Sequence, residues 1–152
     1  MLRATCIAPA GHRHPAAAAD RVLLDHQARH RRRATLTGKT GLEFLLDLPA
    51  AMQLIDGDAI LLEDGRFVMV EAATEALLEV TARDAASLTR IAWHLGNRHT
   101  PVELFGDRLR FLEDHVLAAM VRGLGGSIQS VTAPFSPEGG AYEQAEPVHR
   151  HD

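Results

Sequence analysis

The chain has 152 residues, 46% of them hydrophobic and 24% charged, which suits one ordinary globular domain or two small ones. The formal net charge of −4 does not favour nucleic acid as a partner, and the single cysteine, Cys6, excludes both a disulfide within the chain and a thiolate-rich metal site. No apolar run approaches the roughly 18 residues of a membrane span, and no signal-peptide pattern opens the chain, so we expect a soluble cytoplasmic protein with no membrane partner.

Residues 1–73 predict a β-rich domain, because short apolar stretches separated by glycine turns are typical of a small sandwich or barrel. Asp64-Gly65 joins two of these stretches and is the strongest hairpin signal in the chain. A further strand is expected to stop at Pro49, because proline cannot donate a ladder hydrogen bond. A basic cluster, Arg29 and Arg31 to Arg33, either contacts a partner or forms a solvated strand end. The predicted strands are Leu2–Ala8, 42–48, 59–63 and 66–71.

Residues 74–135 predict a ferredoxin-like domain. Asp84 and Asp114 can each cap a helix, and Gly96 is expected to cap the C-terminal end of the first one. Apolar residues recur at i, i+3, i+4 and i+7 in both helices, as Leu88, Ile91, Ala92 and Leu95, then Leu117, Met120, Val121 and Leu124. With strands at 76–81, 101–104, 108–112 and 127–133, the element order is β-α-β-β-α-β. The predicted fold class is therefore α+β, and residues 136–152 are expected to be a flexible tail that contains His149 and His151.

His99 is the first candidate metal ligand. The chain has nine histidines, more than packing requires at this length, and His99 follows a probable helix end. One imidazole cannot hold a transition metal tightly, because such ions take roughly four to six ligands. A histidine beside the two-fold axis of a homodimer is presented twice, which would bring two imidazoles to one ion. The alternative is a surface histidine that bonds a helix carbonyl.

Further candidate ligands are His149, His151 and His115. Alternate histidines on an extended tail can wrap an ion that is held elsewhere, and Asp152 adds oxygen donors. Imidazole with carboxylate suits Ni²⁺, Zn²⁺, Co²⁺ or Cu²⁺. His115 follows Asp114 at a helix start, where a structural role is the alternative.

Three other patterns do not support chemistry. Gly38-Lys39-Thr40 lacks the earlier glycine of a phosphate-binding loop, since that position is Arg33. Asp56 and Asp58 flank a turn glycine, which indicates a structural pair. No nucleophile motif and no HExxH motif occurs, so we expect a protein that is not an enzyme. A small metalloenzyme would need a fixed ligand set with an open position and a placed acid or base.

Several segments resemble the UreE family of urease accessory proteins, in the family's order and over residues 20–142. They are Gly41-Leu42-Glu43-Phe44-Leu45-Leu46-Asp47-Leu48-Pro49, Asp56-Gly57-Asp58, Leu62-Glu63-Asp64-Gly65-Arg66, His94-Leu95-Gly96-Asn97-Arg98-His99-Thr100-Pro101, Asp114-His115-Val116-Leu117 and Pro134-Phe135 through Gly140-Ala141-Tyr142. The resemblance implies a nickel metallochaperone with a peptide-binding-type N-terminal domain and a homodimer joined through its metal-binding domains. It implies His99 of both chains as the central ligands, further ligands from the tail, and the urease GTPase accessory protein and apo-urease activation complex as partners.

Two departures from the family pattern matter. Some members end in a long histidine-rich tail, whereas this chain ends with His149 and His151, which argues against nickel storage. Some members also carry a histidine two residues before the position of His115, where this chain has Glu113. Our hypothesis is that His99 supplies fixed ligands and the tail histidines exchangeable ones. A metal-storage or metal-responsive regulatory protein is the alternative function.

Overall fold

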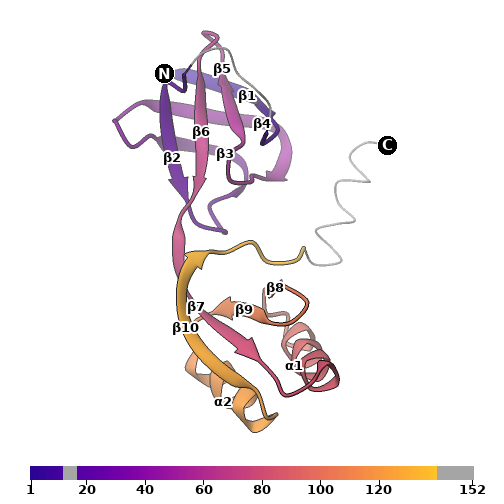
Figure 1. Cartoon of the computed structure of the whole chain (residues 1–152). Coiled ribbons are helices and arrows are strands. Elements are labelled where there is room, and N and C mark those ends of the chain that lie inside the picture. Colours follow the sequence, from indigo (N-terminus) through magenta and orange to yellow (C-terminus); the bar gives the residue numbers. More distant parts are fainter. Residues whose placement is uncertain (12–16, 140–152) are drawn as a thin grey trace. The chain divides into compact units, whose positions relative to one another are not determined.

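The computed structural model of the chain describes residues 1–11 and 17–139 (Figure 1). Contacts divide the chain into two units, Met1–Ala73 and Thr74–Asp152. No helix in the described ranges is long and apolar enough to cross a membrane. Each unit is built around its own apolar core.

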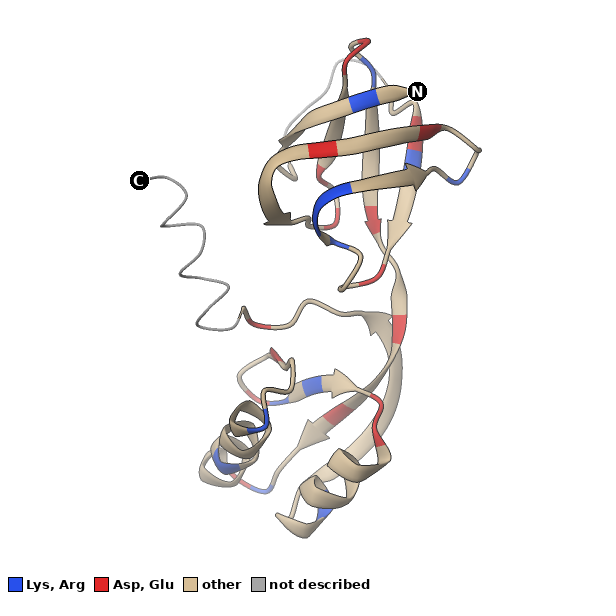
Figure 2. Cartoon of the chain, turned by 180° about the vertical axis from the view of Figure 1, so that it is seen from behind, with Lys and Arg blue, Asp and Glu red and all other residues tan. Residues whose placement is uncertain are grey.

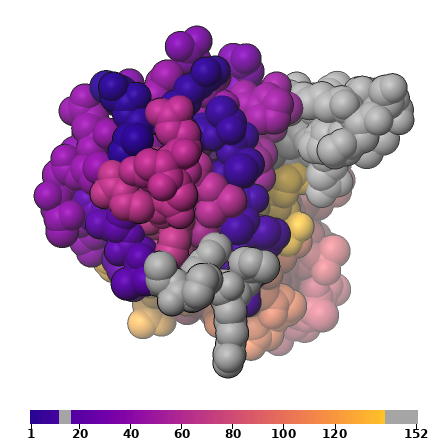
Figure 3. All heavy atoms as spheres, turned by 90° about the horizontal axis from the view of Figure 1, so that it is seen from above, coloured from indigo at the N-terminus to yellow at the C-terminus, as the bar shows by residue number. Residues whose placement is uncertain are grey.

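The N-terminal unit is a curled, six-stranded sheet, seen from behind in Figure 2. The strand order is β2-β6-β5-β1-β4-β3, with β1 parallel to β4, β2 parallel to β6, and the other neighbours antiparallel. The strands are β1 (Leu2–Ala8), β2 (Asp20–Leu24), β3 (His30–Thr37), β4 (Glu43–Gln53), β5 (Ala59–Leu62) and β6 (Phe67–Ala72). The pleat turns alternate side chains such as Phe44, Leu46 and Leu48 into the core. From above, the indigo to magenta atoms are the outer face of this unit (Figure 3).

The expected end of a strand at Pro49 is wrong, because β4 continues to Gln53. The pairing of β4 with β3 nevertheless shifts its register around this residue: Arg33 lies opposite Asp47, but Arg31 lies opposite Met52. Proline has no N–H to donate to a neighbouring strand, so it interrupts the ladder without ending the extended backbone.

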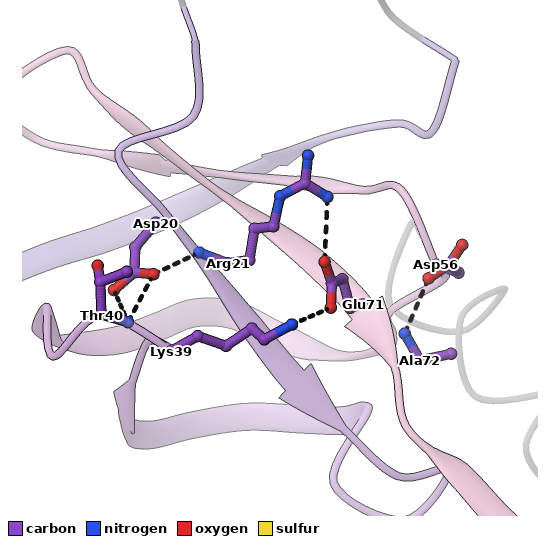
Figure 4. Close-up of polar contacts among 7 residues, drawn as sticks. All are labelled: Asp20, Arg21, Lys39, Thr40, Asp56, Glu71 and Ala72. Atoms are coloured by element: carbon purple, nitrogen blue, oxygen red, sulfur yellow. Dashed lines mark hydrogen bonds and ion pairs between the residues drawn. The ribbon is translucent and has the colours of Figure 1, made fainter.

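A buried carboxylate ties the two margins of this sheet together (Figure 4). Asp20 lies on β2 at one margin and accepts hydrogen bonds from the N–H groups of Thr40 and Leu42 at about 3.1 Å, in the turn between β3 and β4. A Cβ atom on Gly38 would collide with the Asp20 side chain, so this turn requires glycine there. The segment that loosely resembled a phosphate-binding loop therefore serves to hold an aspartate.

The C-terminal unit confirms the predicted β-α-β-β-α-β order. Its antiparallel sheet has the strand order β10-β7-β9-β8. The elements are β7 (Thr74–Thr81), α1 (Ala85–Asn97), β8 (Glu103–Leu104), β9 (Leu109–Leu112), α2 (His115–Gly123) and β10 (Ser127–Pro134). Apolar residues of the two helices and of the sheet form one core cluster, which includes Leu78, Ile91, Leu95, Phe111 and Val121. The α+β fold class is thus confirmed for the described chain.

Both predicted helix starts are confirmed. The carboxylate of Asp84 accepts a hydrogen bond of 2.7 Å from the N–H of Ser87, and that of Asp114 accepts from Val116 at 2.9 Å and Leu117 at 3.0 Å. Each aspartate therefore satisfies backbone donors that have no partner within the helix.

Candidate metal site

His99 occupies an unusual backbone position just beyond helix α1. Its φ of 59° makes it the only residue other than glycine with a positive φ among those the structure describes. The N–H of His99 donates to the carbonyl of Gly96 at 3.0 Å, and the N–H of Thr100 donates to Leu95 at 3.1 Å. These two bonds define a Schellman motif in which the left-handed residue is His99. The predicted cap at Gly96 is wrong, because α1 continues to Asn97 and Arg98 is its C-cap.

Helix α2 ends in the same motif, but with glycine at the left-handed position. Gly125 has a φ of 88° and donates its N–H to Arg122, while Gly126 donates to Val121 at 2.9 Å. A left-handed conformation costs an L-residue about 1–2 kcal/mol, and glycine avoids this cost. Histidine is tolerated there better than most residues, yet glycine is the common solution. A histidine at the strained position points to a use for its side chain.

The imidazole of His99 lies on the surface, beside the exposed Arg98. Within residues 1–11 and 17–139, no three His, Cys, Asp or Glu side chains converge as a metal-binding group. The described part of the chain thus presents His99 as an exposed imidazole that belongs to no group of three candidate ligands. His94 is half-buried within α1, and its ring packs edge-on against Trp93 with 5.1 Å between centroids, which gives it a packing role.

The other predicted ligands are His115 in the described chain and two histidines outside the described residues. His115 is the exposed first residue of α2, next to the capping Asp114. It belongs to no group of three or more ligand side chains in the described ranges. His149 and His151 lie outside the described residues. The assignment of all four histidines to a metal site stays a prediction.

The chain that leads to these last two histidines is anchored close to His99. The N–H of Glu138 donates to the carbonyl of Val102 at 2.8 Å. Val102 follows His99 by three residues, so their Cα atoms lie within about 11 Å of each other. Sequence reasoning did not find this contact, because it joins residues far apart in the chain and carries no local pattern.

The paired carboxylates Asp56 and Asp58 are structural, as expected. Asp58 is buried and accepts hydrogen bonds of 2.8 Å from the N–H groups of Ala10 and Ile55. Asp56 accepts one from Ala72 at 2.8 Å. Both carboxylates are therefore committed to holding backbone segments together.

The basic cluster divides into two kinds of residue. Arg29 is 2% exposed and donates from Nη1 to the carbonyl of Leu24 at 2.8 Å, so its role is structural. Arg31, Arg32 and Arg33 are exposed on β3, where Figure 2 colours them blue. A contact between these three arginines and a partner stays a prediction.

A surface hollow in the N-terminal unit is lined in part by an ion pair between Arg21 and Glu71. Glu71 accepts a hydrogen bond from Lys39 Nζ at 3.0 Å and another from Arg21 Nη1 at 3.1 Å (Figure 4). Bonding to Lys39 first, and to Arg21 second, lowers the pKa of the Glu71 carboxyl. The Glu71 carboxylate is therefore committed to two cationic side chains.

Comparison with known proteins identifies the family to which both units of the chain belong. A family model for the N-terminal domain of UreE urease accessory protein matches residues 4–73, and one for its C-terminal domain matches residues 75–152. Three similar relatives are all named urease accessory protein UreE. That of Bradyrhizobium sp. (strain ORS 278) is 56% identical over 99% of this chain and 70% of the relative. That of Bradyrhizobium sp. (strain BTAi1) is 53% identical over 100% of this chain and 73% of the relative. That of Beijerinckia indica is 51% identical over 100% of this chain and 87% of the relative.

Both halves of the chain thus match the same family, and the relatives match it from end to end. The chain belongs to the UreE family of urease accessory proteins, which are nickel chaperones and not enzymes.

Proposed function

We propose that this chain is a cytoplasmic nickel metallochaperone that binds Ni²⁺ at a dimer-interface site and delivers it for assembly of the urease metallocentre. In this proposal His99 from each of two chains supplies the fixed ligands. His149 and His151 supply exchangeable ligands, and His115 is an auxiliary candidate. The single observation that carries the proposal is the exposed imidazole of His99, held in a left-handed conformation at the end of α1 in a UreE-family chain.

The requirement for a dimer follows from ligand counting. Transition metals take roughly four to six ligands, whereas the described residues place no three candidate ligands together. A two-fold axis beside the end of α1 would present His99 twice without any further ligand in the sequence. The Schellman motif fixes the backbone from which each imidazole projects, which favours a defined ligand direction.

Chain length allows the tail histidines to reach this site. His149 follows Glu138 by eleven residues, and such a segment spans at most about 36–40 Å. The segment starts at Glu138, which is hydrogen-bonded to Val102, and the Cα atom of Val102 lies within about 11 Å of that of His99. Withdrawal of tail ligands would lower the coordination number of the ion and open it to exchange with an acceptor. A chaperone needs this combination, because it must bind its cargo and also release it.

The proposed division of labour gives residues 1–73 to a peptide-binding-type domain, 74–135 to the metal-binding domain and 136–152 to the tail. The acceptors are the urease GTPase accessory protein and the apo-urease activation complex. Zn²⁺, Cu²⁺ and Co²⁺ are expected to bind the same imidazoles in vitro, because all accept nitrogen ligands. A metal-storage or metal-responsive regulatory role is the second candidate, and the presence of only two tail histidines does not favour storage.

The deciding experiment is calorimetric titration with Ni²⁺, combined with light scattering to give the mass of the species that binds. Wild type, His99→Ala and a His149→Ala/His151→Ala variant would be compared at one protein concentration. One tight ion per dimer, lost in His99→Ala and weakened in the tail variant, would support the proposal. Tight binding by a monomer, or binding that is indifferent to His99, would refute it. Transfer of the ion to apo-urease by wild type, and not by His99→Ala, would separate delivery from storage.

A further inference from the structure

Strand β3 forms one margin of the N-terminal sheet and leaves one side of its backbone open. It is the last strand in the order β2-β6-β5-β1-β4-β3, so β4 is its only neighbour in the sheet. Outside that pairing, residues 31–37 make no backbone–backbone hydrogen bond to any residue that the structure describes. Their outward N–H and carbonyl groups are therefore available to an added strand.

The opposite margin, β2, is less accessible than β3. The N–H of Lys39 donates to the Arg21 carbonyl of β2 at 2.8 Å, and the Asp20 carboxylate holds the same turn through the N–H of Thr40. Part of the β2 edge is therefore covered by the turn that follows β3. Of the two margins of this sheet, β3 is the one that offers a longer uncovered edge.

The open edge carries three consecutive exposed arginines, Arg31 to Arg33, which lie on the blue part of β3 in Figure 2. Arg31 donates from Nε to the Ala28 carbonyl at 3.2 Å. Arg32 and Arg33 make no side-chain hydrogen bond or ion pair with another residue of the described ranges. The carboxylate opposite Arg33 in the strand register, that of Asp47, instead accepts hydrogen bonds from Arg3. The guanidinium groups of this edge thus have donors left for a further acceptor.

These charges decide which strands can pair with the edge. Residues opposite each other on neighbouring strands have Cβ atoms about 4.5–5.5 Å apart, so opposite charges stabilise a pair and like charges destabilise it. A second copy of β3 paired about Arg32 would place arginines against arginines, whereas an acidic strand would place carboxylates against them. The arginines therefore oppose self-pairing and favour an acidic strand.

We propose that the β3 edge is a docking surface for an extended acidic peptide segment of a partner protein, which adds a strand to the sheet. The outward backbone groups supply hydrogen bonds, and Arg31 to Arg33 select carboxylates through charge-assisted contacts. This inference rests on the part of the proposed function that gives residues 1–73 a peptide-binding role, and it is independent of the Ni²⁺ ligands. It specifies where on this unit the peptide lies and which charge the peptide carries.

The test is a titration of the full chain, read by fluorescence polarisation, with a synthetic peptide as the probe. The probe is a capped, dye-labelled peptide of about seven residues in which glutamates alternate with threonines, a length that matches residues 31–37. One control peptide carries lysine in place of each glutamate. A second control keeps the glutamates but has N-methyl groups on its peptide nitrogens, which removes the donors that strand addition requires.

Two matched variants separate the β3 edge from arginines in general. Arg32→Gln/Arg33→Gln removes two charges from the edge. Arg66→Gln/Arg83→Gln removes two charges from exposed arginines elsewhere and leaves the same net charge. The whole chain carries a formal net charge of −4, so its overall charge does not attract an acidic peptide. Amide hydrogen exchange of wild type with and without the peptide tests strand addition without any substitution.

We expect wild type and Arg66→Gln/Arg83→Gln to bind the acidic peptide equally, and Arg32→Gln/Arg33→Gln to bind it on the order of 10-fold more weakly. The lysine and N-methylated peptides should bind little, and binding of the acidic peptide should slow amide exchange in residues 31–37.

Three results would overturn the inference. They are no binding of the acidic peptide by wild type, equal weakening in the two variants, and equal binding of the N-methylated peptide. The last two would indicate a general attraction between arginines and carboxylates without an added strand. Ni²⁺ titration of Arg32→Gln/Arg33→Gln separates these failures from a failure of the proposed metal function, because this variant retains His99 and should bind Ni²⁺ as wild type does.

Discussion

Replacement of His99 by glycine is expected to stabilise the fold while it abolishes metal binding. The left-handed conformation at φ 59° costs an L-residue about 1–2 kcal/mol, less for histidine than for most side chains. Glycine removes this cost but loses about 0.5–1 kcal/mol through its larger conformational freedom in the unfolded chain. The balance predicts a gain of about 0.5 kcal/mol for metal-free His99→Gly, with loss of the tight Ni²⁺ site.

Two matched substitutions calibrate this prediction. His99→Ala also removes the imidazole but keeps a Cβ atom, so it retains the backbone cost and should be no more stable than wild type. Gly125→Ala places a Cβ atom at the same position of the motif that ends α2, where φ is 88°, and should lose about 1 kcal/mol. The imidazole and the backbone conformation are thereby tested separately.

The assay is urea unfolding of metal-free protein, followed by tryptophan fluorescence. Trp93 is the only tryptophan, and it lies on α1, so its signal reports the C-terminal unit that contains every substitution. Protein concentration must be constant, because association would shift the apparent stability. A His99→Gly variant less stable than wild type would show that the imidazole itself stabilises the folded chain. A ligand role would then not be needed to account for histidine at this position.

Three further predictions follow from other parts of the structure. Gly96→Ala should raise urea stability by about 0.5–1 kcal/mol, because Gly96 is helical and a Cβ there meets no atom within 4 Å; a loss of Ni²⁺ binding in a well-folded variant would instead show that another molecule approaches this surface. Asp114→Ala should cost about 1 kcal/mol through the lost cap of α2, measured by the same fluorescence assay; an unchanged urea midpoint would count against the cap. Asp20→Asn should lower the unfolding midpoint of the N-terminal unit by circular dichroism at neutral pH. Burial raises the pKa of Asp20, but hydrogen bonds from Arg21, Thr40 and Leu42 more than offset this and leave its pKa lowered, so the ionised form stabilises the fold above an aspartate's usual pKa of about 3.9. This contribution is lost as pH falls through the lowered pKa, so the two proteins should converge in acid; a constant difference would mean that the amide causes damage unrelated to charge.

Local signals were sufficient to predict most of the C-terminal unit. Asp84 and Asp114 cap the two helices because a side chain and its backbone partners lie within one turn, and this pattern is visible in sequence. Asp64-Gly65 likewise indicates the β5–β6 hairpin, in which Gly65 has a φ of 91°. An interaction between residues only a few positions apart leaves a recognisable sequence pattern, because all the residues that form it lie in one short segment.

Long-range pairings were not predictable in the same way. β2 pairs in parallel with β6, and the choice of partner depends on the closure of the sheet and not on the five residues of β2. The tie between Asp20 and the β3–β4 turn is of this kind, and so is the bond from Ser136 to Glu103. Because each brings together segments far apart in the chain, neither follows from local propensity.

The sequence indicates His99 as a candidate ligand but does not reveal its backbone conformation. His99 was chosen for its place beyond a helix, and Gly96 was given the cap because glycine is the usual left-handed residue. Helix α1 instead runs one residue past Gly96, since apolar periodicity places its end within only about one turn. The strain at His99 is therefore a property that only the backbone dihedral angles reveal.

The aspartate tie in the N-terminal unit also bears on aggregation. An edge strand exposes a row of N–H and carbonyl groups that can pair with a strand of another molecule. Here the N–H of Lys39 donates to the Arg21 carbonyl of β2 at 2.8 Å, so the turn held by Asp20 occupies part of that edge. Gly38 makes the arrangement possible, because any side chain at this position would displace the aspartate. A substitution at Gly38 would thus expose backbone groups of β2 that can pair with a strand of another molecule. We therefore expect such a variant to aggregate and to be less soluble in the cell.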